Sequence, residues 1–148
     1  MLDRPAKLNA LATAVLEEML FAIHWLDAQE DITVVVFGGH GRAFSAGADL
    51  EIFDAVADVP TPRLRHMADL GRQVADALES MRAVTVARLH GQCVGGGALV
   101  LALACDLRVA AASTIFAVPE LALGVPLGWG GVPRLVREIG RRQPASWC

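Results

Sequence analysis

Residues 90–106 read HGQCVGGGALVLALACD, and the remaining chain is arranged around this stretch. It follows an apolar, strand-like segment, Val84–Leu89, and its glycine triplet leads into a run of strong helix formers, Ala98–Ala104. Glycine has no Cβ, so backbone and ligand can approach each other closely. The first turn of a helix leaves N–H groups without intrahelical partners, at the positive end of the helix dipole. The stretch can therefore supply half of an oxyanion hole, and a buried helix packed tightly at its glycines is an equally good interpretation.

The composition describes one apolar and mildly acidic domain. The 148 residues are enough for a single domain with its own core. Hydrophobic residues make up 54% of the chain and its mean hydropathy is +0.44, which indicates surface that is buried against a partner subunit or a further segment. The net charge of −3 argues against a general nucleic-acid or anionic-membrane surface.

The cysteines and the longest apolar run bear on the compartment. Cys93, Cys105 and Cys148 are odd in number and lack the spacing of metal ligands, which indicates small buried thiols in a reduced, cytoplasmic protein without a metal site. The apolar run Val94–Cys105 is shorter than the roughly 18 residues that a membrane span needs. No basic segment followed by an apolar core is present at the start, so we expect no signal peptide.

The spacing of apolar residues predicts alternating helices and strands. Helices are expected over residues 10–29, with Asn9 as the N-cap, and over 63–82, 98–104 and 133–139. Strands are expected over residues 33–37, 84–89, 107–111 and 115–120. This alternation argues for an α/β fold with a mostly parallel sheet. The small-residue loop 43–50 lacks the Lys-Ser/Thr pair of a nucleotide-binding P-loop.

One carboxylate lies in a setting that suits proton transfer. Glu120 follows Pro119 and precedes the apolar segment 121–125. Partial removal from water favours the protonated form of a carboxylate, as a general acid or base requires, whereas an exposed turn glutamate is the plainer alternative. Two glycine-bearing loops, 46–48 and 95–97, can each present a backbone N–H. Two convergent N–H donors and one base fit the stabilisation of an enolate beside a thioester carbonyl.

Four blocks of sequence carry a resemblance to a known family. They are residues 4–11 (RPAKLNAL), 41–50 (GRAFSAGADL), 91–108 around the glycine triplet, and 116–135, which contains FAVPE and GGVPRL. In this order they are similar to the crotonase (enoyl-CoA hydratase/isomerase) family. The resemblance implies a ClpP/crotonase-like spiral of ββα repeats over residues 1–140, followed by an irregular tail over residues 141–148.

The resemblance also implies a site and a substrate. The N–H groups of Ala48 and Gly97 would hold the oxygen of an acyl-CoA thioester, and Glu120 would be the catalytic residue. The residues that would contact the coenzyme A part of the substrate are Ala10, Ala46, Asp49 and Leu50. No cofactor is implied apart from coenzyme A itself, and the family usually forms trimers or dimers of trimers.

The chain departs from the family at one catalytic position and at both ends. Hydratases of the family carry a second glutamate six residues before the Asp of Cys-Asp, and Val100 stands there. A single carboxylate suits proton transfer between C2 and C4, as in Δ3-Δ2-enoyl-CoA isomerases, better than hydration. Compared with the family pattern, the first strand is reduced to almost nothing, and residues 141–148 stand where the family has a helical region. The alternatives are therefore an inactive or truncated remnant, or a family hydratase, hydrolase or decarboxylase.

Overall fold

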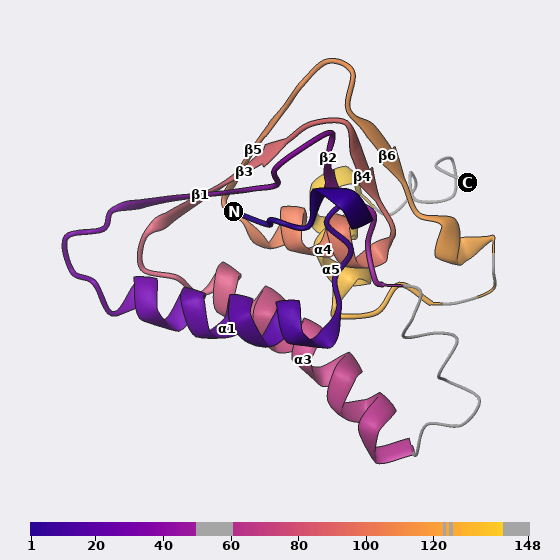
Figure 1. Ribbon diagram of the computed structural model, residues 1–148, viewed down its shortest axis with the longest axis horizontal. Helices are drawn as coiled ribbons and strands as arrows, with labels where there is room; N and C mark the ends of the chain where they lie inside the picture. Colours follow the sequence, from indigo (N-terminus) through magenta and orange to yellow (C-terminus); the bar gives the residue numbers. More distant parts are fainter. Residues whose placement is uncertain (50–60, 123, 125, 141–148) are drawn as a thin grey trace.

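Two small sheets and a layer of helices enclose a common core in the computed structural model, which describes residues 1–49, 61–122, 124 and 126–140. The sheets form two sides of a triangle in Figure 1, and helices α1 (Thr13–Asp27) and α3 (Thr61–Glu79) form the third side. Helices α4 (Gly96–Ala104) and α5 (Gly131–Ile139) lie between these sides. The expected tail 141–148 lies outside the described residues.

Both sheets are parallel and three-stranded. The first has the order β1-β3-β5, made of β1 (Val34–Gly38), β3 (Val84–Leu89) and β5 (Leu107–Ala110). The second has the order β2-β4-β6, made of β2 (Ala43–Ser45), β4 (Gln92–Val94) and β6 (Ile115–Ala117). Each strand of the first sheet is followed by one of the second and then by a helical segment. The expected ββα repeats and the parallel pairing are therefore confirmed.

The sequence predicted one sheet where the structure has two. Strands β2 and β4 were missed because each has only three residues and lies beside glycines, so neither shows an apolar alternation that could be read. The other expected strands and all four expected helices are present, with ends that differ by a few residues. The strand expected over residues 115–120 ends at Ala117, and Pro119–Leu121 is a 3-10 helix. The prediction that Asn9 caps the first helix was wrong, because α1 begins at Thr13 and its N-cap is Ala12.

Helix α4 is the centre of the core. All nine of its residues are buried, as expected for a helix that is apolar on every side. The aromatic rings of Phe37 on β1 and Phe44 on β2 pack edge to face, 5.4 Å between centroids, and join the two sheets beside it. Within the described ranges, none of the helices combines the length and the hydropathy that crossing a bilayer requires.

A buried arginine fixes α5 to α3. Arg134 is 7% exposed, and its Nη2 lies 2.7 Å from both Asp76 Oδ1 and Glu79 Oε2. Its Nη1 donates to the Trp129 carbonyl at 3.0 Å. A second hydrogen bond to Glu79, from Arg137, lowers the pKa of the Glu79 carboxyl. Because a buried charge is costly without partners, this network fixes the turn at residues 128–130 against α3.

Candidate active site

Two loops that are far apart in the sequence meet at the ends of β2 and β4. A Cβ on Gly47 would lie 2.8 Å from the Val94 carbonyl oxygen and 3.0 Å from Gly95 Cα. A Cβ on Gly95 would lie 3.1 Å from Gly47 Cα and 3.3 Å from the Ala46 carbonyl oxygen. The 2.8 Å at Gly47 is too short for a Cβ, and the distances at Gly95 are tighter than ordinary contacts. Both glycines also have positive φ, so a side chain at either position would be strained. The two glycines thus allow the backbones of the two loops to approach each other closely.

The backbone of Leu11 orients the first loop. The Leu11 N–H donates to the Gly47 carbonyl at 2.8 Å, and the Asp49 N–H donates to the Leu11 carbonyl at 3.2 Å. In such a parallel bridge the amide of the residue between, Ala48, points away from Leu11. Within the described residues the Ala48 N–H donates no hydrogen bond, so it is available to a ligand.

The second loop begins helix α4. Gly97 is the second residue of the helix, and no described residue accepts a hydrogen bond from its N–H. Its Cα is covered by Leu11 and by the Trp129 ring, since a Cβ there would lie 2.7 Å from Trp129 Cζ3 and 3.2 Å from Leu11 Cδ1. Gly97 thus combines a free donor of the first helical turn with a contact that only glycine permits.

Glu120 reaches the same place from a short 3-10 helix, Pro119–Leu121. Its Oε1 accepts a hydrogen bond from the Gly96 N–H, and a Cβ on Gly95 would lie 3.3 Å from this oxygen. Its Oε2 is buried and accepts no hydrogen bond from any described residue. The side chain is half-buried, so the alternative of an exposed turn glutamate was wrong. One carboxylate oxygen is thereby held at the start of α4, and the other has no hydrogen-bond partner among the described residues.

Three of the four predicted coenzyme A contacts, Ala10, Ala46 and Asp49, lie within the described residues. Asp49 is 4% exposed, and its Oδ2 lies 2.9 Å from Arg4 Nη1 in an ion pair. The same Arg4 nitrogen donates to the Ala10 carbonyl at 2.6 Å, so the first sequence block is fastened to the loop 46–48. Ala46 is half-buried in that loop, and Leu50 lies outside the described residues. The structural part played by Arg4 was missed, although Arg4 and Asp49 both stand in the blocks that carry the resemblance.

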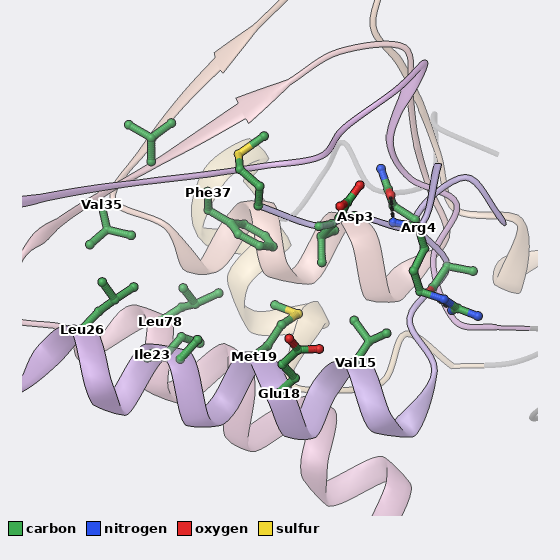
Figure 2. A pocket seen from close by; sticks show the side chains of 16 residues that line it. Asp3, Arg4, Val15, Glu18, Met19, Ile23, Leu26, Val35, Phe37 and Leu78 are labelled. Carbon is green, nitrogen blue, oxygen red and sulfur yellow. Dashed lines mark hydrogen bonds between the residues drawn. The ribbon is translucent and has the colours of Figure 1, made fainter. Parts of the chain in front are cut away.

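Ala10 lines a separate hollow of about 490 Å³ between α1 and β1 (Figure 2). Apolar side chains line most of it, and Asp3, Arg4 and Glu18 give it polar atoms. The main apolar residues are Val15, Met19, Ile23, Leu26, Val35, Phe37 and Leu78. Neither Glu120 nor the loops 46–48 and 95–97 contribute to its lining. Ala10 thus lines a hollow to which Ala48, Gly97 and Glu120 do not contribute.

The position expected for a second glutamate is apolar and packed. Val100 is fully buried, and its Cγ2 would lie 2.5 Å from a Cβ on Gly131, so it belongs to the contact between α4 and α5. No residue of Gly96–Ala104 carries a carboxylate. His90 Nε2 lies 2.9 Å from the Gly41 carbonyl oxygen, in agreement with a structural histidine. Among the described residues no group of His, Cys, Asp or Glu side chains could hold a metal ion.

Comparison with known proteins gives consistent results. Residues 1–147 match the family model described as Enoyl-CoA hydratase/isomerase. The short-chain-enoyl-CoA hydratase of Clostridium acetobutylicum is 34% identical over 140 residues, which are 94% of this chain and 52% of that protein. The crotonyl-CoA hydratase of Syntrophomonas wolfei is 32% identical, with the same two shares covered. A crystal structure of an enoyl-CoA hydratase from Bacillus anthracis superposes with a TM-score of 0.88 at 32% identity, covering 97% of this chain and 55% of that one. The chain therefore spans about half the length of the curated relatives it matches.

Proposed function

Since the chain belongs to the enoyl-CoA hydratase/isomerase family, we propose that it acts on acyl-CoA thioesters through an enolate, with Glu120 as the single acid/base residue. The observation that carries the proposal is the Glu120 carboxylate. Its Oε1 is held by the Gly96 N–H, and its buried Oε2 is unpaired among the described residues. A carboxylate oxygen that is held in place, shielded from water and without a hydrogen-bond donor is suited to take a proton from carbon.

The proposed steps use three groups of this chain. The Ala48 and Gly97 N–H groups donate to the thioester oxygen, where negative charge develops as a proton leaves C2. Glu120 Oε2 removes that proton, which leaves a dienolate when the substrate is a 3-enoyl thioester. The same oxygen returns the proton at C4, and the double bond moves to C2–C3. No water is consumed, so one carboxylate is sufficient.

Hydration is the second candidate, because the curated relatives described above are named hydratases. Addition of water benefits from two carboxylates that position and activate it. Helix α4 offers none, because Gly96–Ala104 is apolar throughout. On this ground we place isomerisation before hydration. An inactive remnant of the family is the third candidate, since the chain spans about half of these relatives.

Replacement of Glu120 by Gln tests the proposal. With the full 148-residue chain, a 3-enoyl-CoA is incubated in deuterated water, and deuterium at C2 and C4 is followed by mass spectrometry. We expect exchange and isomerisation with the natural chain and a loss of at least about 100-fold with Glu120→Gln. Glu17→Gln is the matched control, because Glu17 is exposed on α1 and should leave the rate unchanged.

Three results would contradict parts of the proposal. Retained exchange in Glu120→Gln would mean that another base acts. Efficient hydration of crotonyl-CoA by the natural chain would favour the second candidate. A natural chain that neither exchanges protons nor gains thermal stability with any acyl-CoA would favour the remnant.

The proposal extends to substrate contacts and assembly. Ala10, Ala46, Asp49 and Leu50 are assigned to the coenzyme A part of the substrate, and the chain to a trimer or a dimer of trimers in the cytoplasm. We expect an added acyl-CoA to protect these residues from hydrogen exchange and the same fatty acid without coenzyme A to leave them unprotected. That result would support the contacts. The mass in solution tests the assembly.

A further inference from the structure

The outer face of the sheet β1-β3-β5, on the side away from the helices, is apolar and uncovered. Alternate residues of each strand point to this face, and five of them are between 45% and 61% exposed. The five are Val34, Val36, Val84, Leu107 and Val109. They are large, and four of the five are β-branched, although an exposed sheet face is usually polar.

The strand register makes these side chains neighbours. Val34 pairs with Val84, and Val36 pairs with Val86, which pairs in turn with Leu107. Together the exposed side chains offer on the order of 450 Å² of contiguous apolar surface, in the range of the largest patch on an ordinary monomer. All-parallel sheets occur almost only with both faces covered. The strands thus have the apolar sequence of a sheet that is buried on both faces, but the described residues cover only one of its two faces.

The two ends of this face carry opposite charge. Arg88 lies at the carboxyl end of the strands, where its Nε would be 3.4 Å from a Cβ on Gly38. Beside it an open hollow of about 490 Å³ includes His40 and His90. Glu30 and Asp31 are exposed in the turn before β1, at the amino end, and they outnumber Arg82, whose Nη2 donates to the Gln29 carbonyl of the same turn at 2.6 Å. None of these charged side chains forms an ion pair with another described residue.

We propose that this face is covered by the same face of a second copy, with the strands of the two sheets antiparallel. A two-fold axis in the plane between the sheets brings the Arg88 end of each copy onto the Asp31 end of the other. The patch is then self-complementary, as an isologous contact requires. Sheets that pack face to face keep their strands within about 30° and lie about 10 Å apart, which apolar side chains of this size fill.

The available area agrees with a dimer of moderate affinity. A standard interface buries roughly 800 Å² on each partner, of which a little more than half is apolar. The exposed apolar side chains alone provide on the order of half of that area, and the charged ends and the hollow beside Arg88 supply a polar rim. The contact uses neither the loops 46–48 and 95–97 nor Glu120, so it is independent of the proposed activity.

A charge exchange tests the contact. The dissociation constant of the full chain is measured by sedimentation equilibrium for the natural chain, Arg88→Glu, Asp31→Arg and the double variant. Each single change places two pairs of like charges in the contact and should weaken it at least about 10-fold. The double variant should regain the natural constant. An equimolar mixture of the two single variants should also associate, because every pair in the mixed dimer joins opposite charges.

Charges on the helices, far from the proposed contact, provide the controls. Arg65→Glu and Glu17→Arg change exposed charges on α3 and α1 and should leave the constant unchanged. Thermal unfolding of each variant shows whether it is folded. A chain that stays monomeric at its highest soluble concentration would overturn the proposal, as would an assembly that Arg88→Glu leaves intact. Failure of the mixed variants to associate would overturn the antiparallel arrangement, and binding of the monomer to lipid vesicles would assign the face to a membrane.

Discussion

Asn9 connects the segments that build the candidate site. It is 1% exposed, and its Oδ1 accepts from the Arg4 N–H at 2.9 Å. Its Nδ2 donates to the carbonyls of His40 and Ala43, each at 2.9 Å. The sequence predicted a helix-capping role for it, because Asn before an apolar helix is typical of an N-cap. The partners lie 31 and 34 residues away, and no local pattern reveals bonds of that range.

Asn9→Ala should therefore be far more costly than a surface change. It leaves buried polar groups without partners. It also places alanine at φ 55°, a left-handed conformation that the side-chain hydrogen bonds of asparagine help to stabilise. We expect a loss of about 3 kcal/mol in the free energy of unfolding, measured with urea. Asn9→Gly loses the same bonds without the backbone strain and should recover about 1 kcal/mol. A loss below about 0.5 kcal/mol in Asn9→Ala would show that these bonds do not matter.

The contact between Thr85 and Asp106 makes the free energy of unfolding depend on pH. The Thr85 N–H and Oγ1 donate to Asp106 Oδ2 at 2.7 and 2.8 Å. These bonds lower the pKa of the Asp106 carboxyl below its ordinary 3.8. A lowered pKa in the folded state stabilises the protein at pH above the ordinary value, and this contribution is lost as the pH falls through the lowered one.

Thr85→Val removes the hydroxyl and keeps the shape of a fully buried side chain. We expect the variant to lose about 1 kcal/mol in the free energy of unfolding at pH 7. The difference from the natural chain should narrow as the pH falls below 3.8, where Asp106 of the unfolded chain takes up a proton, and on through the lowered pKa of the folded state. Urea unfolding at several pH values measures it, and a difference that is the same at pH 7 and pH 3 would refute the link to Asp106.

At the scale of elements, Trp129 joins α3 to α4. A Cβ on Gly71 would lie 2.0 Å from Trp129 Cε2, and one on Gly97 would lie 2.7 Å from Cζ3. The indole therefore fills the space between two glycines, one on each helix. Periodicity predicted both helices, but it could not predict this contact, because the two glycines and the ring lie in three separate segments.

Gly71→Ala should reverse the usual effect of alanine in a helix. Replacement of a helical glycine by alanine ordinarily stabilises by about 1 kcal/mol. Here the new methyl group meets the indole, and we expect a loss of about 2 kcal/mol in the free energy of unfolding instead. In a Trp129→Ala background the same change should become stabilising. Gly128→Ala, with no atom within 4 Å of its Cβ, is the matched control and should be near neutral. A stabilising Gly71→Ala in the natural chain would disprove the contact.

At the scale of the whole molecule, the sequence predicted the α/β class, the parallel pairing and the ββα repeat. The resemblance also singled out Ala48, Gly97 and Glu120, and the two loops and Glu120 lie close together in the structure, while their roles stay predictions. The angle between the sheets was not predictable, because it depends on where three-residue strands pair. Nor was the hollow that Ala10 lines, because it depends on how α1 packs against β1.

Burial of the cysteines offers a measure of global opening. Desolvation raises the pKa of Cys93 to about 12 and that of Cys105 to about 11, so both are thiols at pH 8. In a Cys148→Ser background, a thiol reagent should label the native chain at least about 100-fold more slowly than the chain in urea. Rapid labelling of the native chain would show that the core opens easily.

The bond between Glu120 and the Gly96 N–H couples chemistry to helix stability. In the proposed reaction Glu120 alternates between a carboxylate and a carboxylic acid. The anion is a strong acceptor and complements the positive end of α4, whereas the neutral acid does neither as well. During each turnover, the beginning of α4 is thus held least firmly while Glu120 carries the proton. Return of the proton to carbon tightens that anchor again, which favours completion of the transfer.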